Sequence, residues 1–353
     1  MESQFDPDAG TVMDGGRIVA FSFNKFVNDI CKDGHCFICG TPRDETFNDE
    51  HVIPKWLLRW AGLFDQSITL PNTVKLKYSQ YTLPCCRECN SFYGKNLEER
   101  VQPLLTQGYA SLTAGLDRKS SELLFVWVAF VFFKTHLKDT QLRLHLNKQK
   151  GEQPISSKYD FAWLHHIHAV IRSIYTGAKL EPACIGTFLV LNAPEGPTST
   201  PFDFRDINGI NTILLRVGDT ALLASLDDAK LSQPFLKGHI DATAGKPMSP
   251  IQLREMLAHL SFVSWSLSHR PLFRNEYDPA ARTSTIRAAV PQQVQMANAP
   301  KTTFGQMLYL CTFDMLPKLG IRDLAALEAE VKTGEVGFIF DENGDFHVNG
   351  AMR

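Results

Sequence analysis

Three short stretches decide the fold of this 353-residue chain: CFICG at 36–40, NDEHVIPKW at 48–56 and CCRECNSFYGKNLEERV at 85–101. The first and last each contain a C-x2-C pair, formed by Cys36 with Cys39 and by Cys86 with Cys89. A two-residue spacer lets a tight turn direct both sulfurs at one ion, and four thiolates complete a tetrahedral site. The two pairs therefore predict one structural zinc ion. The 46 residues between them exceed a simple zinc ribbon, which predicts a substantial structure in the gap.

The other cysteines need a separate interpretation. Six of the eight lie between Cys31 and Cys89, and clustering of this kind, without a visible secretory signal, indicates metal binding rather than disulfides. Cys85 could replace Cys86 as a ligand, but the second spacer would then be three residues, so Cys86 is preferred. We interpret Cys31 and Cys85 as spare structural thiols. Cys184 and Cys311 stand alone and are expected to be buried as small apolar side chains.

An acid and a histidine lie between the two pairs. Glu50 and His51 are followed by two β-branched residues and Pro54, which predicts the end of a strand that leads into a turn. Neighbouring side chains of a strand face opposite ways, so the two residues can serve different partners. Metal-assisted hydrolysis uses such a pair, because a carboxylate binds magnesium and a neutral histidine deprotonates water. Alone, the dipeptide is usually structural; between two zinc pairs it becomes a candidate site.

The combination resembles the HNH endonucleases, in the branch whose ββα-metal fold is held by zinc. The similarity covers about Cys36 to Val101, less than a quarter of the chain. It implies that His51 activates water for attack on a phosphodiester. It also implies that Glu50 and Asn90, which directly follows Cys89, bind a catalytic magnesium or manganese ion. The four cysteines of the pairs match the zinc ligands. The resemblance implies an N-terminal treble-clef-like module. Together with the mixed helical and β pattern of the C-terminal region, this predicts the α+β fold class.

Two features depart from the family pattern. The middle Asn of the family falls on Tyr81 here, and Asn72 is at the wrong distance to replace it. The hairpin also carries an insertion from about Trp56 to Thr82. Basic and aromatic side chains gather in and beside it: Lys55, Trp56, Arg59, Trp60, Lys75, Lys77 and Tyr78. They could hold a phosphate backbone and stack on bases, or form a local core with solvated lysines.

Charge and hydropathy limit the partners. The chain has 36 Lys plus Arg and 38 Asp plus Glu, and the segment from Lys32 to Arg100 has nine of each. A protein that coats nucleic acid non-specifically is usually basic, so contact with DNA, the usual substrate of the family, must come from a local patch or from elsewhere in the chain. The longest apolar run, Leu123 to Phe133, has 11 residues against about 20 for a membrane span. We expect no membrane partner and a cytoplasmic location.

The pattern along the chain predicts three parts: a flexible N-terminus at 1–20, the nuclease module at 21–105, and a mixed α/β region at 106–353. Residues 280–302 are predicted to be an exposed linker or loop. Helices are expected at about 90–105, 120–138, 161–175, 250–267 and 323–332. Strands are expected at 187–191, 211–217 and 221–226, with a turn at Gly218-Asp219 and a hairpin around Asn343-Gly344.

Two hypotheses about function remain. The first is a metal-dependent endonuclease that a ligand or protein partner controls through the C-terminal region, as in defence against foreign DNA. The second is a zinc-stabilised module that binds nucleic acid or protein without cutting. Three histidines, His165, His166 and His168, suggest a second metal site less strongly than ordinary packing. A basic stretch from Lys138 to Lys150 suggests a solvated face more than a nucleic-acid contact.

Overall fold

The computed structural model describes residues 10–70, 72–194 and 200–348, which form helices and several small sheets in a mixed α+β arrangement. The chain divides into two compact units. The first contains Met1–Leu104, Asp117–Cys184 and Pro271–Ala289, and the second contains Leu105–Leu116, Ile185–Arg270 and Val290–Arg353. The predicted boundary at residue 105 coincides with the end of the first segment. The residues beyond it are divided between both units, so 106–353 is not one body.

The first unit carries short strands and two long helices. Its strands are β1 (Val12–Asp14), β2 (Arg17–Ala20), β3 (Phe47–His51), β4 (Ser67–Thr69), β5 (Lys75–Lys77), β6 (Thr82–Cys86), β7 (Lys179–Leu180), β12 (Leu272–Asp278) and β13 (Thr283–Ala289). Its α-helices are α1 (Phe23–Lys25), α2 (Lys55–Trp60), α3 (Arg87–Tyr93), α4 (Glu99–Thr106, which crosses into the second unit), α6 (Arg118–Asp139) and α7 (Ala162–Thr176). Other helical turns are η1 (Phe26–Lys32), η2 (Tyr78–Gln80), η3 (Gly94–Glu98), η4 (Lys148–Lys150), η5 (Ile155–Lys158) and η6 (Pro182–Cys184).

Helix α6 forms the core of the first unit, as its uniformly apolar sequence predicts. Its N-cap is Asp117, whose carboxylate accepts from the Ser120 backbone N–H at 2.7 Å, so the helix begins before the serines expected to cap it. By length and composition α6 could cross a membrane, but 83% of its apolar window is buried inside the protein. The core helix of a folded protein meets the same criteria of length and composition and is also mostly buried. Helix α7 packs against α6 and ends at Thr176, with its C-cap Gly177 in the left-handed conformation.

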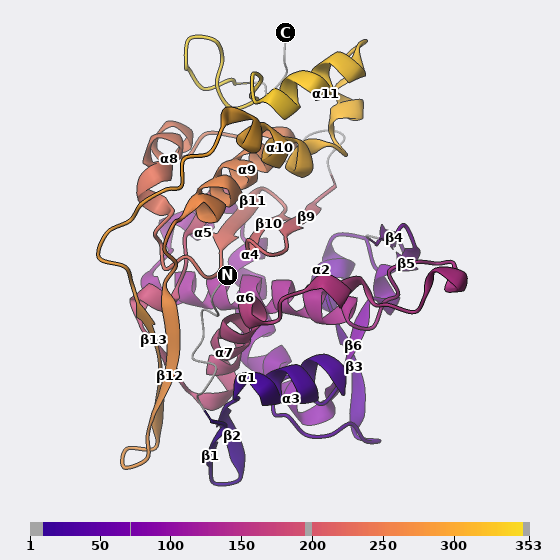
Figure 1. Cartoon of the computed structure of the whole chain (residues 1–353), viewed down its shortest axis with the longest axis vertical. Helices are drawn as coiled ribbons and strands as arrows, with labels where there is room; N and C mark the ends of the chain where they lie inside the picture. The colour runs from indigo at the N-terminus through magenta and orange to yellow at the C-terminus, as the bar shows by residue number, and fades with distance from the viewer. Residues whose placement is uncertain (1–9, 71, 195–199, 349–353) are drawn as a thin grey trace. The chain divides into compact units, whose positions relative to one another are not determined.

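A β–β–α arrangement holds the motif residues. Strand β3 pairs antiparallel with β6, which leads directly into α3, and the two strands lie side by side in Figure 1. Helix α3 continues through the π-helical turn η3 into α4, so the helix expected from Asn90 to about Leu105 is present in three segments. The insertion between β3 and β6 folds as α2, the β4–β5 hairpin and η2.

Two sequence predictions for this unit were wrong. Residues 12–20 are not loose: β1 and β2 pair, and Arg282 forms an ion pair with Asp14 at 2.8 Å. Residues 1–9 lie outside the described part of the chain. The predicted linker at 280–302 is wrong for 283–289, which form β13: this strand pairs antiparallel with β12 in the long hairpin of Figure 1 and parallel with β7, whereas 290–300 are mostly exposed and outside any helix or strand. Alternate burial of Ser284 and Ile286 is the period-two signal that its polar composition concealed.

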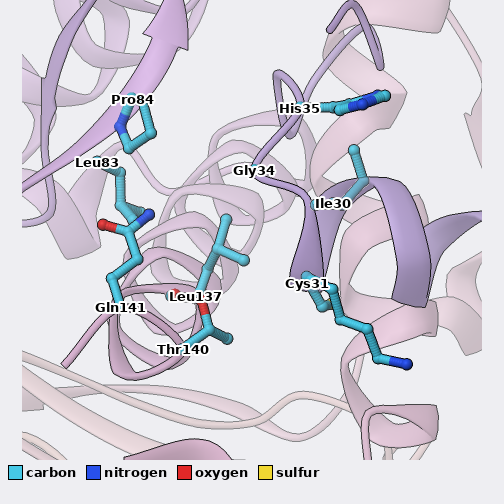
Figure 2. A pocket seen from close by; sticks show the side chains of 10 residues that line it. Ile30, Cys31, Gly34, His35, Leu83, Pro84, Leu137, Thr140 and Gln141 are labelled. Atoms are coloured by element: carbon cyan, nitrogen blue, oxygen red, sulfur yellow. Dashed lines mark hydrogen bonds between the residues drawn. The ribbon is translucent and has the colours of Figure 1, made fainter. Parts of the chain in front are cut away.

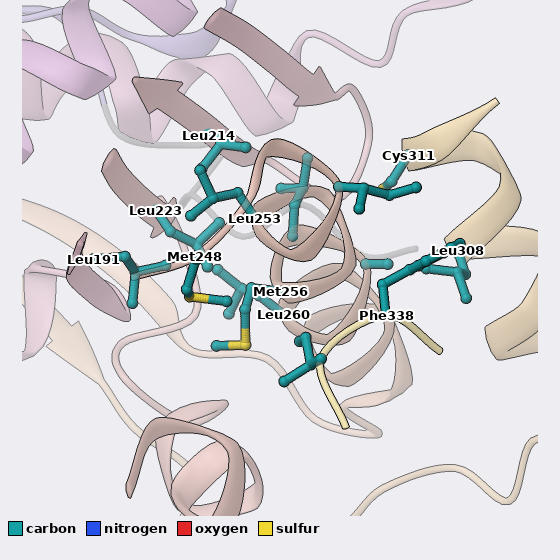
Figure 3. Close-up of a cluster of buried hydrophobic side chains, with 14 of the residues drawn as sticks. Leu191, Leu214, Leu223, Met248, Leu253, Met256, Leu260, Leu308, Cys311 and Phe338 are labelled. Atoms are coloured by element: carbon teal, nitrogen blue, oxygen red, sulfur yellow. The ribbon is translucent and has the colours of Figure 1, made fainter. Parts of the chain in front are cut away.

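The second unit is a sheet covered by a helix. The sheet has the order β8 (Phe188–Asn192), β11 (Thr220–Ser225), β10 (Thr212–Val217) and β9 (Phe202–Ile207), all antiparallel. The remaining elements are α5 (Tyr109–Ala114), η7 (Gln233–Leu236), α8 (Lys237–Thr243), α9 (Pro250–Ser266), α10 (Lys301–Thr312), η8 (Leu316–Leu319) and α11 (Leu324–Thr333). Figure 3 shows leucines of β8, β10 and β11 facing Met256 and Leu260 of α9, with Leu308 of α10 on the other side.

Two of the three local predictions for this unit are confirmed, the start of α9 and the turn between β10 and β11. Ser249 and Gln252 form the expected capping box before α9. The two-residue turn Gly218-Asp219 joins β10 to β11 in register, with Gly218 at a φ of 61°. The expected C-terminal hairpin is reduced to one bridge between Phe340 and Phe346.

Candidate functional site

Four cysteines from two parts of the chain converge. The sulfurs of Cys36, Cys39, Cys86 and Cys89 all lie within 4.8 Å of one another, and the Sγ atoms of Cys39 and Cys86 are 3.7 Å apart. A tetrahedron of sulfurs around zinc has edges of about 3.8 Å, from a zinc–sulfur bond of about 2.3 Å. The group can therefore hold a metal ion such as zinc. In the described part of the chain no other His, Cys, Asp and Glu side chains form such a group.

The backbone of the first pair explains its geometry. Gly40 adopts a φ of 82°, and its N–H donates to the Cys36 carbonyl at 2.8 Å, which closes the turn. A Cβ at Gly40 would lie 2.7 Å from the Phe21 ring, so no other residue fits. Helix α7 holds the same turn, because Arg172 Nε donates to the Ile38 carbonyl at 2.6 Å and the His168 ring contacts the Phe37 carbonyl at 2.7 Å.

The three histidines of α7 pack rather than bind metal. His165 contacts the Phe21 carbonyl through Nε2 at 2.9 Å, and His166 stacks on Phe273 with ring centroids 3.5 Å apart. Burial lowers the pKa of His165 to about 4 and that of His166 to about 3, so both are neutral. These contacts agree with the interpretation of the three histidines as ordinary core packing.

The electrostatics of the cysteines favour a bound cation. Sulfur contacts lower the pKa of Cys36, chiefly through Cys39, and raise the pKa of Cys89, chiefly through Cys36. Because clustered thiolates repel one another, the four do not all ionise by themselves. A dication among them would supply the charge that lets every thiol deprotonate.

His51 is the last residue of β3 and is half-buried. Its Nε2 is buried and has no hydrogen-bond partner among the described residues, and its ring lies 5.9 Å from that of Phe64. Burial lowers the pKa of His51 below 6.5; Glu50 opposes this shift, whereas Lys55 adds to it. The imidazole is therefore neutral near pH 7, with a nitrogen able to accept a proton.

Glu50 faces the interior, opposite to His51, as strand geometry requires. Its carboxylate forms an ion pair with Lys134 of α6, whose side chain is 0% exposed. The same ammonium donates to the His51 carbonyl at 2.7 Å and lies 3.7 Å from Glu98. One lysine thus joins two acids to the end of β3. This contact occupies the carboxylate that the family resemblance assigns to a catalytic metal.

The buried lysine gives a stability prediction. Replacing Lys134 with methionine leaves the buried Glu50 carboxylate without its cation, which should destabilise the first unit by about 3–5 kcal/mol. Lys138→Met, one turn further along α6, removes a hydrogen bond to Gln141 at 3.2 Å and an attraction to Asp49, and should cost less than about 1 kcal/mol. Urea unfolding of both variants measures the difference. Equal losses would contradict the role given to Lys134.

Glu98 gives a pH prediction. Burial, with help from Glu50, raises its pKa from 4.5 to about 7, against the lowering effect of Lys134. Between these values the folded state binds more protons than the unfolded state, so stability falls as pH rises, by at most about 1.4 kcal/mol per unit. Glu98→Gln should therefore gain stability over the wild type as pH increases from 4.5 to 7. Unfolding curves across that range test this, and a constant difference would contradict it.

Asn90 lies on α3, and its Nδ2 donates to Asn48 Oδ1 at 2.8 Å and reaches the Asp49 carbonyl at 3.5 Å. The helix therefore meets β3 where the sequence predicts. Asn72 does not replace the missing middle Asn, because its Nδ2 donates to the Arg143 carbonyl at 2.6 Å, away from the β3–β6 hairpin. Glu50 and Asn90 share no bonding partner among their described contacts.

A small pocket lies elsewhere in the first unit (Figure 2). Cys31 and His35 line one side, Pro84 and Gln141 the other, and the volume is about 70 Å³. Ligand pockets usually measure about 300–1,000 Å³, so this one does not fit a nucleotide. Neither His51 nor Asn90 lines it. The candidate site is therefore the end of β3, not this pocket.

Sequence reasoning missed Lys134 and Glu98. Lys134 directly follows the apolar run of α6 and is as buried as that run, so the one visible signal was a lysine inside an all-buried helix. Glu98 follows α3 without any motif. Comparison with known proteins adds no further residue, because no family model, curated protein or solved structure matches the chain.

Proposed function

We propose that the chain is a zinc-stabilised endonuclease that hydrolyses phosphodiester bonds in nucleic acid, with DNA as its expected substrate. One observation carries the proposal: His51 ends β3 of a β–β–α arrangement beside the four-cysteine group, with an unpartnered, buried Nε2. The lowered pKa of His51 supports it, because a general base must be neutral at working pH. This arrangement agrees with the HNH resemblance of the sequence.

His51 has a single role in this proposal. It takes a proton from water as the water oxygen bonds to phosphorus, and the bond from phosphorus to the 3′ oxygen breaks. Lys134 holds the backbone of His51 through its carbonyl, which fixes the place of the imidazole. The second unit, which the sequence suggests as a control region, takes no part in this step.

The support for zinc differs from the support for a catalytic divalent ion. Zinc fits the four sulfurs, and we propose Cys36, Cys39, Cys86 and Cys89 as its ligands. The resemblance implies magnesium or manganese at Glu50 and Asn90, which would stabilise charge on the phosphate. These two side chains do not form a ready cation site, since Lys134 neutralises Glu50 and the Asn90 amide donates to Asn48. Dependence on a divalent ion is therefore a property to measure.

A second function is favoured by that same ion pair. If Lys134 holds Glu50 permanently, the chain is a zinc-stabilised module that binds nucleic acid or protein without cutting. Such a module would bind equally well with or without His51.

The deciding experiment is nicking of supercoiled plasmid by pure full-length protein, with magnesium, with manganese and with neither. Omitting the ions is a cleaner control than a strong chelator, which would also remove zinc. Cleavage that requires a divalent ion and His51 supports the endonuclease. Cleavage that survives His51→Ala contradicts it, and binding without cleavage favours the second function.

A further inference from the structure

Two cations of α2 lie close to His51. Lys55 and Arg59 are exposed and four residues apart, so they share one face of the helix. Lys55 Nζ lies 5.9 Å and Arg59 Cζ lies 5.6 Å from the centre of the Phe64 ring. The same ring is 5.9 Å from that of His51. A single aromatic side chain therefore contacts both cations and the proposed base.

These two charges are uncompensated. Among the described residues neither Lys55 nor Arg59 has a carboxylate within ion-pair distance, whereas Lys25 and Lys237 each pair with an aspartate four residues on. The positive potential reaches His51, since Lys55 helps to lower its pKa. Two exposed cations that share a face and have no anion among the described residues are suited to an anion from outside the chain.

The support beneath the cations is fixed. The Phe64 carbonyl accepts from the Ser79 N–H at 3.1 Å, which ties it to η2 on the far side of the β4–β5 hairpin. Contact with an aromatic face restrains a lysine or arginine and leaves its charged end exposed. A restrained guanidinium binds phosphate oxygens in a defined geometry, and an ammonium adds a point charge. The folded insertion thus holds Phe64 in place beneath the two cations.

We propose that Lys55 and Arg59 bind the phosphodiester backbone beside the scissile bond and place the strand against His51. This inference rests on the proposed function and names the part of the substrate that the site contacts. Contacts with phosphates carry no sequence information, so this pair gives position and affinity rather than specificity. Both DNA and RNA offer the required chemistry.

The test is binding, separated from cleavage by a His51→Ala background. A short fluorescent DNA duplex, and RNA of the same sequence, are titrated with the protein over a range of salt concentrations. Each phosphate contact adds about 0.9 to the slope of log affinity against log salt on duplex DNA. Lys55→Gln with Arg59→Gln should make the slope shallower by about 1.8 for two contacts.

The matched control removes the same charge elsewhere. Arg118→Gln with Lys119→Gln lies at the N-terminus of α6, about 24 Å along the helix from Lys134 at about 1.5 Å per residue. This pair should leave the slope unchanged. Equal losses in both double variants, an unchanged slope in the α2 variant, or no binding by the parent protein would each overturn the proposal. Plasmid cleavage by the wild type reports separately on the proposed function, so either can fail alone.

Discussion

Replacing His51 with alanine should lower the rate of plasmid nicking by about 10²- to 10⁴-fold, the range that a general base contributes. The reason is that the imidazole of His51, which its lowered pKa keeps neutral, is the group proposed to take the proton from water. Stability should change little, because the side chain is half-buried and its ring contact is with Phe64 alone among the described aromatic pairs. Steady-state nicking and urea unfolding of the same preparation measure both effects.

The pH profile adds an independent readout. The neutral imidazole is the active form, and burial lowers its pKa below 6.5. Activity should therefore persist below pH 6.5 and fall only at more acidic values. His145→Ala is the matched control, since His145 is an exposed histidine of the same unit. A loss in both variants would point to a change in folding, and unchanged activity in His51→Ala would remove His51 as the base.

The motif residues were predictable because their signals are local. Two C-x2-C pairs, Glu50-His51 and Asn90 are each visible within a few residues of sequence. Strand alternation also predicts that Glu50 and His51 face opposite ways, as they do. The choice of Cys86 over Cys85 followed from the spacer length, and Cys86 belongs to the group of four sulfurs.

What the sequence did not reveal depends on contacts between distant residues. Glu50 and Lys134 are 84 residues apart, and the Arg172 contact with Ile38 spans 134. No periodicity or spacing links such positions. As a result, we expect that a fragment of residues 20–110 would not fold independently: it lacks α6, which neutralises Glu50, and α7, which holds the first cysteine turn.

Replacing Cys86 with serine should remove the metal and unfold much of the first unit. Apparent zinc binding to four-ligand structural sites is worth about 10–16 kcal/mol at neutral pH, and that free energy stabilises the folded state. The loss should spread from the turn at Cys36 to β6 and α3, which the site joins. Zinc per chain from native mass spectrometry and a urea unfolding curve measure the effect.

Cys85→Ser is the discriminating control, because the two cysteines are neighbours in β6 and both are buried. Cys85 Sγ lies 3.8 Å from Cys36 Sγ, so one sulfur distance cannot separate the candidates. The sulfur of Cys86, and not that of Cys85, belongs to the group in which all four sulfurs lie within 4.8 Å of one another. We expect Cys85→Ser to keep zinc and to cost about 1–3 kcal/mol for a buried hydroxyl. The reverse result would make Cys85 the ligand, and zinc binding unchanged in both variants would remove the four-cysteine site itself.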